Sequence, residues 1–248
     1  MIMSKKNNHK AIVFDMDECI GCFWSLWPLY DLYNRDEIND ISNLIKLAQK
    51  TILPTCLRPN LYYLLQFLSI LKEKQKVKNI FLYTNNGNYL TVKNKKENKI
   101  TFPHFIIKCI ETHFNLPGLF DLVIETIFIR KKDARNNIKK KKIEDLEIHG
   151  YENPQNILIF DDNKSVWITG SERVCHVSAF KGTSHSYKDI EGLCTILYKQ
   201  FKNIFKNKLD SKRYLEYFIE NEPPEPYTNL EDNEITKLFF PYILKFCL

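Results

Sequence analysis

Two aspartates spaced one residue apart follow a short apolar run near the start of the chain. The run Ala11–Phe14 is rich in strand-forming residues, and Asp15 and Asp17 come directly after it. Because alternate residues of an extended chain point the same way, both carboxylates can face one small volume at the end of a strand. Two carboxylates at close range repel each other unless one is protonated or a cation lies between them. The pair therefore predicts a metal-assisted site with a candidate nucleophile.

Two further apolar runs, at residues 80–83 and 157–160, end in polar side chains in the same way. Those polar side chains belong to Thr84, Asn85, Asp161 and Asp162. In open α/β sheets the ligand site lies at the carboxyl ends of the strands, so the three runs predict one shared site. Each run taken alone is also typical of a turn with capping side chains, and their joint order is what favours an active site.

The motifs resemble, in type and order, those of the haloacid dehalogenase superfamily. They are most similar to its branch of NLI-interacting-factor-like phosphatases. These are relatives of the phosphatases that act on the C-terminal domain of RNA polymerase II, and they include versions from large DNA viruses and protists. The resemblance covers residues 10–180 and rests on the segments Phe14–Gly21, Leu57–Pro59, Tyr83–Asn86 and Phe160–Asp162. One departure is Cys19, where the branch usually has a threonine with a supporting role, so the departure bears on the positioning of Asp17.

The resemblance implies a Rossmann-like three-layer α/β/α fold with a central, mainly parallel sheet. We expect a phosphatase domain at 1–196 with a small flap or lid insertion at 20–57. We also expect a helical C-terminal extension at 197–248, packed on the domain or on a partner. The insertion is long enough for a flap and one lid helix but not for a separate cap domain, and its dense aromatic residues favour plain core packing.

Hydrophobic spacing predicts the other elements that position the motifs. Helices are expected at 60–74, 105–114 and 143–149, and strands at 120–129 and 174–177. The helix at 143–149 follows the strongest charge run of the chain, which spans residues 130–142. A charge run is usually a solvated loop, and here it is equally placed to guide an anionic substrate.

The resemblance also implies the chemical roles of the candidate residues. Asp15 is expected to form an aspartyl-phosphate. Asp17 is expected to protonate the leaving alcohol and then to take a proton from the hydrolytic water. Thr84 is expected to donate a hydrogen bond to the phosphoryl oxygens, and Asn85 to help bind the substrate.

Mg²⁺ is the expected cofactor, because magnesium prefers hard oxygen ligands and retains several waters. Its expected ligands are the Asp15 carboxylate, the main-chain carbonyl of Asp17 and the Asp161 carboxylate. Asp162 stands where the branch often has asparagine, so we expect it to bind through water.

A lysine is expected to neutralise the phosphoaspartate, and the run at 139–142 offers four consecutive candidates. Lys141 stands at the position implied by the Lys-x-apolar-x-Asp-Leu pattern, which continues through Asp145. Lys142 is the rival, and both are candidates for substrate binding. The remaining lysines are interpreted as solvent-exposed.

Composition is that of an ordinary globular chain. The 248 residues are 44% hydrophobic and 27% charged, which is consistent with one α/β domain with additions. The net charge of +6 favours anionic partners such as phosphorylated protein or nucleic acid. No secretory signal or membrane-spanning stretch is visible, so an intracellular location, cytoplasmic or nuclear, is expected.

The seven cysteines are an odd number in a chain without an export signal, and we interpret them as reduced thiols. Cys19 and Cys22 form a C-x-x-C pair without a nearby second ligand pair for zinc. They are interpreted as two semi-buried thiols, with a redox pair beside the catalytic strand as the alternative.

The resulting functional prediction is a Mg²⁺-dependent phosphomonoester hydrolase. By resemblance its substrate class is protein phosphoserine or phosphothreonine, because a minimal cap leaves the site open to large substrates. A nucleotide or nucleic-acid end phosphatase is the alternative that the basic run favours. A weakly catalytic scaffold that binds a phosphorylated partner is the alternative of another class, and the intact Asp15 and Asp17 argue against it. No oligomeric state is predicted.

Overall fold

The computed structural model describes most of the chain. The described residues are 9–35, 37–85, 100–126, 140–151, 153–181, 194–199, 201–219 and 234–247. Most of the predicted basic run, at 130–139, lies outside them, as do residues 127–129 of the strand predicted at 120–129.

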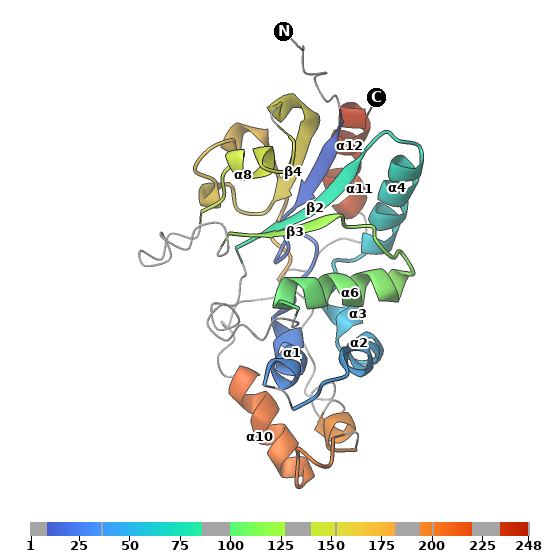
Figure 1. Cartoon of the computed structure of the whole chain (residues 1–248), viewed down its shortest axis with the longest axis vertical. Coiled ribbons are helices and arrows are strands. Elements are labelled where there is room, and N and C mark those ends of the chain that lie inside the picture. Colours follow the sequence, from blue (N-terminus) through green and yellow to red (C-terminus); the bar gives the residue numbers. More distant parts are fainter. Residues whose placement is uncertain are drawn as a thin grey trace.

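A five-stranded sheet forms the centre of the molecule (Figure 1). Its strands are β1 (Ala11–Phe14), β2 (Asn79–Thr84), β3 (Leu122–Glu125), β4 (Ile157–Asp161) and β5 (Val174–His176). All neighbouring pairs are parallel and the order is β3-β2-β1-β4-β5. The strands β2 and β3 are therefore added on one side of β1, and β4 and β5 are added on its other side. This sheet, flanked by helices, confirms the predicted Rossmann-like three-layer α/β fold.

Alternating side chains of the strands feed two hydrophobic clusters, one on each face of the sheet. On one face, Ile12 and Phe14 belong to a cluster shared with α4 (Leu61–Glu73), α11 (Glu234–Leu238) and α12 (Phe240–Cys247). On the other face, Val13 and Tyr83 pack with Leu146 of α8 (Glu144–Glu147) and with Trp167. In Figure 1, α4, α11 and α12 lie on one side of the sheet and α8 lies on the other. Both faces are thus covered, as a parallel sheet requires.

The C-terminal helices contribute directly to the first of these clusters. The ring of Phe239, between α11 and α12, lies 6.0 Å from the Phe14 ring and 4.9 Å from the Phe160 ring, measured between centroids. Phe14 and Phe160 are themselves stacked at 5.3 Å. The segment from α11 to α12 therefore packs against the last residues of β1 and the residue next to the end of β4.

A second group of helices continues the same core below the sheet in Figure 1. It comprises α1 (Trp27–Asn34), α2 (Ile41–Lys50), α3 (Leu53–Cys56), α6 (Phe102–Phe114) and α10 (Lys208–Ile219). Three of these helices, α1 to α3, lie within the insertion predicted at 20–57, where one lid helix was expected. The extra helices form because their apolar side chains join this core, and α1 and α2 contact α6.

The aromatic residues of this insertion support the core-packing interpretation. Trp27 lies 4.8 Å from Phe102, and Tyr30 lies 5.3 Å from the same ring, between centroids. Tyr30 is fully buried, whereas Trp24 is exposed. At the lower end, the Tyr214 hydroxyl of α10 donates to the carbonyl of Pro28 at 2.8 Å.

The remaining elements differ from the predictions mainly at their ends. The helix α6 begins at Phe102, before the predicted residue 105, because Pro103 fits the first turn of a helix. The helix α8 is shorter than the predicted 143–149 and is followed by a turn in which Gly150 has φ +87°. Short 3-10 helices occur at Trp24–Leu26, Pro154–Asn156, Lys164–Val166 and Ser171–Arg173.

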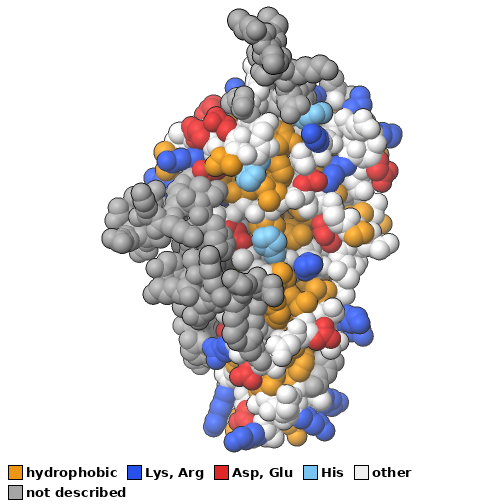
Figure 2. Space-filling model, viewed as in Figure 1, with side chains coloured by type: hydrophobic (Ala, Val, Ile, Leu, Met, Phe, Trp, Pro, Cys, Tyr) orange, Lys and Arg blue, Asp and Glu red, His pale blue; other side chains and the backbone are white. Residues whose placement is uncertain are grey.

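Charge is mixed over the visible surface. Figure 2 shows Lys and Arg side chains interspersed with Asp and Glu side chains, with hydrophobic side chains between them. Among the described residues, no helix has both the length and the apolar character that crossing a bilayer would take.

Candidate active site

The register between β1 and β4 places two of the predicted aspartates side by side. Phe14 and Phe160 are Cα partners in the two strands. The residues that follow them, Asp15 and Asp161, therefore lie at the same level of the sheet. The backbone N–H of Asp15 donates to the carbonyl of Phe160 at 2.9 Å. The pair β1 and β4 is also where the order of strands reverses direction. In open α/β sheets that reversal creates the crevice in which ligands bind.

The ammonium group of Lys141 joins these two carboxylates. Its Nζ donates to Oδ1 of Asp15 and, at 2.7 Å, to Oδ2 of Asp161. The Lys141 side chain is 1% exposed. Lys142, the rival candidate, contributes its backbone N–H to the hydroxyl of Tyr83 at 3.2 Å, and Lys140 is exposed.

A short bridge holds the backbone of Lys141 in place. Its N–H donates to the carbonyl of Val166 at 2.7 Å, and its carbonyl accepts from Ile168 at 2.9 Å. Next to it, the Tyr83 hydroxyl donates to the buried carboxylate of Asp145, which lies in α8. The loop after β4 and the strand β2 thus fix the segment that carries the lysine.

Three carboxylates converge at the same place. Asp15, Asp161 and Asp162 each offer an oxygen, and these oxygens lie within 4.8 Å of one another. Lys141 contacts two of these carboxylates. The three carboxylates and the one ammonium together carry more negative than positive charge. Hard oxygen donors with excess negative charge suit Mg²⁺. The residues present therefore fit the predicted ion.

The pKa values of this group reflect its crowding. Burial raises the pKa of Asp15 to about 8, further supported by repulsion from Asp161 and Asp17 and opposed by attraction to Lys141. Burial, followed by repulsion from Asp161 and Glu18, raises the pKa of Asp162 to about 6. A divalent cation would offset this repulsion and favour the ionised forms.

Lys141 keeps its proton in this surrounding. Burial alone would lower the pKa of the lysine, but the charges of Asp15 and Asp161 outweigh burial and raise that pKa. The group is therefore a charged ammonium at neutral pH. An ammonium at this position can neutralise a negative charge that develops on Asp15.

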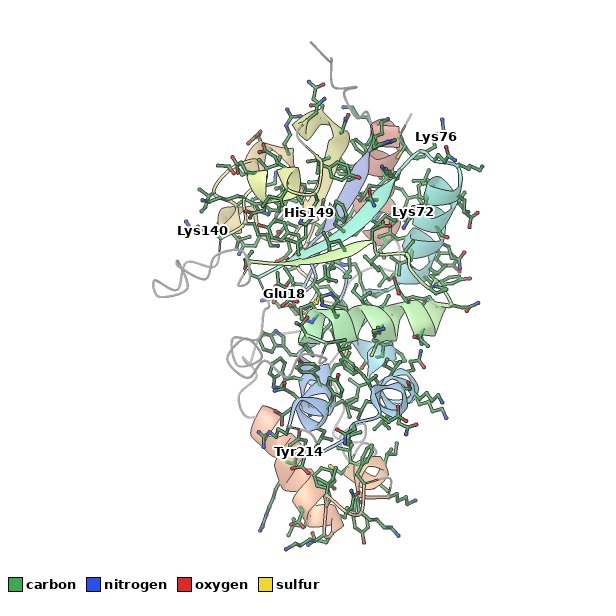
Figure 3. All side chains as sticks on the ribbon, viewed as in Figure 1. Glu18, Lys72, Lys76, Lys140, His149 and Tyr214 are labelled. Atoms are coloured by element: carbon green, nitrogen blue, oxygen red, sulfur yellow. The ribbon has the colours of Figure 1, made fainter. Side chains whose placement is uncertain are left out.

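The loop after β1 has an unusual backbone that other parts of the chain hold in place. Glu18 has φ +61°, in the left-handed region that is costly for a residue with a side chain. Its N–H donates to Gly21 at 2.7 Å, and its carbonyl accepts from the N–H of Phe180 at 2.7 Å. The same carbonyl accepts from the guanidinium of Arg58 at 2.8 Å. Figure 3 shows Glu18 at the carboxyl edge of the sheet, next to α6 in this view.

Arg58 is a fully buried residue that ties this loop to the segment after β5. Its guanidinium also donates to the carbonyl of Cys19 at 2.7 Å and to that of Ser178. In the sequence, Leu57–Pro59 indicates only a resemblance and predicts no contact for Arg58. The structure places this side chain where it fixes the turn that follows Asp15 and Asp17.

Cys19 supplies a hydrogen-bond donor at the position where the resemblance leads us to expect a threonine. Its Sγ lies 3.6 Å from the carbonyl oxygen of Phe160, and the residue is buried. Burial, followed by the charge of Asp15, raises the pKa of this thiol well above its usual value. A redox role depends on the thiolate, so this pKa disfavours Cys19 as the attacking thiol of a redox pair. No cysteine of the described chain forms a disulfide.

The other predicted residues border the cluster. Asp17 forms a short backbone bridge with Gly21, and its carboxylate lies outside the group of three. Thr84 is the buried last residue of β2, the strand next to β1. Asn85 follows it, and its buried side-chain oxygen accepts no hydrogen bond within the described residues. No motif in the sequence predicts a role for Trp167. The path of the loop after β4 brings its indole to Asp161.

No protein-family model, curated protein or solved structure matches the chain. The features of the chain that bear on its function are the carboxylates and the lysine at the carboxyl edge of the sheet, together with the order of their motifs along the chain.

Proposed function

We propose that the chain is a Mg²⁺-dependent phosphomonoester hydrolase of the haloacid dehalogenase type that works through an aspartyl-phosphate on Asp15. The observation that carries this proposal is the buried Lys141 ammonium in contact with Asp15 and Asp161. This arrangement lies where the strand order reverses, which is the usual ligand crevice of such sheets. A purely structural ion pair would not need the third carboxylate, Asp162, beside it.

The reaction has two halves, each of which uses Asp15 and Asp17. In the first, an Asp15 oxygen attacks phosphorus, the phosphorus–oxygen ester bond breaks, and Asp17 gives a proton to the leaving alkoxide. In the second, Asp17 takes a proton from a water whose oxygen attacks the same phosphorus. Inorganic phosphate leaves and the Asp15 carboxylate is restored.

Charge neutralisation is the larger part of the catalytic task, because a phosphate monoester is a dianion. Lys141 supplies one positive charge next to the nucleophile. Asp15, Asp161 and Asp162 would hold Mg²⁺, which would supply further positive charge at the phosphoryl oxygens. Thr84 and Asn85, at the end of the neighbouring strand, are the candidates for hydrogen bonds to the substrate.

The proposed substrate is a protein phosphoserine or phosphothreonine, acted on inside the cell. The support is that α1, α2 and α3 share the hydrophobic core of the sheet rather than having a core of their own. In the part of the chain that the structure describes, these helices form no separate cap domain, which favours a phosphate carried by a large partner.

The test is a phosphatase screen with the purified chain and MgCl₂. The panel is p-nitrophenyl phosphate, phosphoserine and phosphothreonine peptides, nucleotides, 3′-phosphorylated oligonucleotides and a sugar phosphate. We expect hydrolysis of p-nitrophenyl phosphate and the highest kcat/KM for the phosphopeptides. The Asp15→Asn variant is the isosteric control for a contaminating phosphatase. A preference for the oligonucleotides would favour the nucleic-acid end phosphatase, and no hydrolysis of any compound would contradict the proposal.

A further inference from the structure

Trp167 lies in the loop after β4 and is buried against the proposed metal ligand. Its Nε1–H donates to Oδ2 of Asp161 at 2.8 Å. The same oxygen accepts from Lys141 Nζ at 2.7 Å. The other oxygen, Oδ1, accepts from the backbone N–H of Asn163 at 2.8 Å. Three donors, two from the loop after β4 and one from Lys141, thus fix the plane of this carboxylate.

The indole of Trp167 also borders the ammonium. The Nζ of Lys141 lies 5.7 Å from the centroid of the Trp167 ring and 5.6 Å from that of Tyr83. The two rings meet edge to face, with centroids 5.4 Å apart. A cation over aromatic faces is attracted to their negative potential, so the rings favour this position of the ammonium. The backbone bridge between Lys141 and Trp167 couples the two residues again.

We propose that Trp167 is a positioning residue for Asp161 and Lys141, and that its indole reports the binding of a divalent cation to the carboxylate cluster. The proposal rests on the metal-dependent function proposed above. A carboxylate binds a cation best when its own outer contacts hold it in the binding orientation. Because the N–H of Trp167 bonds to Asp161 directly, a cation on that carboxylate changes the charge and the hydrogen bond that the indole senses.

The first test measures binding without turnover. The chain has three tryptophans, so the variant Trp24→Phe/Trp27→Phe keeps Trp167 as its single emitter. We expect its emission to change saturably with MgCl₂, and again when beryllium fluoride is added. A matched variant, Trp27→Phe/Trp167→Phe, keeps only the exposed Trp24 and should show no such change.

The second test separates positioning from general stability. Trp167→Phe keeps an aromatic ring but removes the N–H donor. We expect the Mg²⁺ concentration for half-maximal activity to rise by about 10- to 100-fold, with a smaller change in KM for p-nitrophenyl phosphate. Trp27→Phe makes the same substitution among Tyr30 and Phe102 and should leave the Mg²⁺ requirement unchanged. Thermal unfolding of both variants identifies any that fail to fold.

The outcomes distinguish this inference from the proposed function. If the single Trp167 emitter does not respond to saturating Mg²⁺, or if folded Trp167→Phe has the Mg²⁺ requirement of Trp27→Phe, the positioning role is wrong. If Trp167 responds to Mg²⁺ but the chain hydrolyses no phosphomonoester, the positioning role stands and the phosphatase proposal fails.

Discussion

Charged side chains differ in burial and pairing between the amino ends and the carboxyl ends of the strands, here called the amino edge and the carboxyl edge of the sheet. At the amino edge, Lys72 of α4 lies 2.9 Å from Asp121, and its ammonium also donates to the carbonyls of Gly118 and Leu119. The same Asp121 oxygen accepts from the backbone N–H of Ile80 at 2.8 Å. Both side chains of this ion pair are partly exposed, at 21% and 28%. Each charge therefore has a partner and contact with water.

At the carboxyl edge, charge is buried and unevenly matched. Lys141 and Asp161 are each 1% exposed, and the same ammonium also contacts Asp15. Asp162 adds a third carboxylate, and burial raises its pKa. Removing charges from water can cost more than one ion pair returns. The ion pair at the amino edge forms at little cost in stability, whereas the buried carboxylates at the carboxyl edge lower the stability of the fold. Such an arrangement is typical of a functional site.

The largest expected effect is at Asp15, the proposed nucleophile. Asp15→Asn keeps the shape of the side chain but removes its nucleophilic charge, so kcat on p-nitrophenyl phosphate should fall by about a thousandfold or more. Circular dichroism checks that the variant folds. If Asp15→Asn keeps near-normal activity while Asp17→Asn loses it, the two roles are assigned the wrong way round.

Removal of Mg²⁺ should have a comparable effect. Excess chelator should abolish activity, and returned MgCl₂ should restore it, because the three carboxylates are poorly compensated without a cation. Beryllium fluoride, which mimics a phosphoryl group on a carboxylate, should block the restored activity. Full turnover in excess chelator would contradict the metal requirement.

The next largest difference is expected between a buried and an exposed lysine. Lys141→Ala removes the ammonium between two carboxylates and should lower kcat by roughly 100- to 1000-fold. Lys140→Ala removes an exposed charge and should alter only the salt dependence of substrate capture. Steady-state kinetics at low and high NaCl measure both. Equal, mild effects of the two substitutions would place the catalytic lysine elsewhere.

The crowded edge should also make stability depend on pH. The pKa of Asp162 rises from 3.8 to about 6 on folding, through burial and then repulsion from Asp161 and Glu18. A carboxyl group with a raised folded-state pKa stabilises the fold below its unfolded pKa and loses that contribution as the pH rises through the folded value. Metal-free protein should therefore lose stability between pH 3.8 and about 6. Denaturant titrations should show a smaller loss for Asp162→Asn, and an unchanged slope would argue against this cause.

The amino edge should show the smallest effect on function. Lys72→Ala removes a partly exposed ion pair and two hydrogen bonds to carbonyls, so the free energy of unfolding should fall by about 1 kcal/mol. The value of kcat/KM should stay unchanged, because this ion pair lies at the opposite end of the strands. A large loss of activity without loss of stability would show that the two edges are coupled.

The sequence allowed the strands and the polar residues after them to be predicted, because both signals are local. Asp15 and Asp161 each follow an apolar run, and parallel pairing of those runs brings the two carboxylates together. The choice among consecutive lysines depends on the fold, since only the bridge to Val166 and Ile168 places Lys141 beside the carboxylates. This choice stays a prediction until the lysine variants are measured.

Contacts between distant segments were beyond the reach of local patterns. The hydrogen bond from Trp167 to Asp161 depends on the path of a loop, and the Arg58 contacts join three separate segments. The helices within 20–57 were underestimated for a related reason. Their apolar side chains join a core that includes α6, which lies much later in the chain.

The ring of Phe239 has a consequence for how the protein is made. It covers Phe14 and Phe160, the residues directly before Asp15 and Asp161. During synthesis β1 leaves the ribosome long before Phe239 does. The core around β1 is therefore incomplete until the segment that carries this ring has been made. Domains fold as units once their core residues have emerged. A nascent chain that stops short of residue 239 would thus expose apolar surface beneath the two aspartates and be a substrate for chaperones.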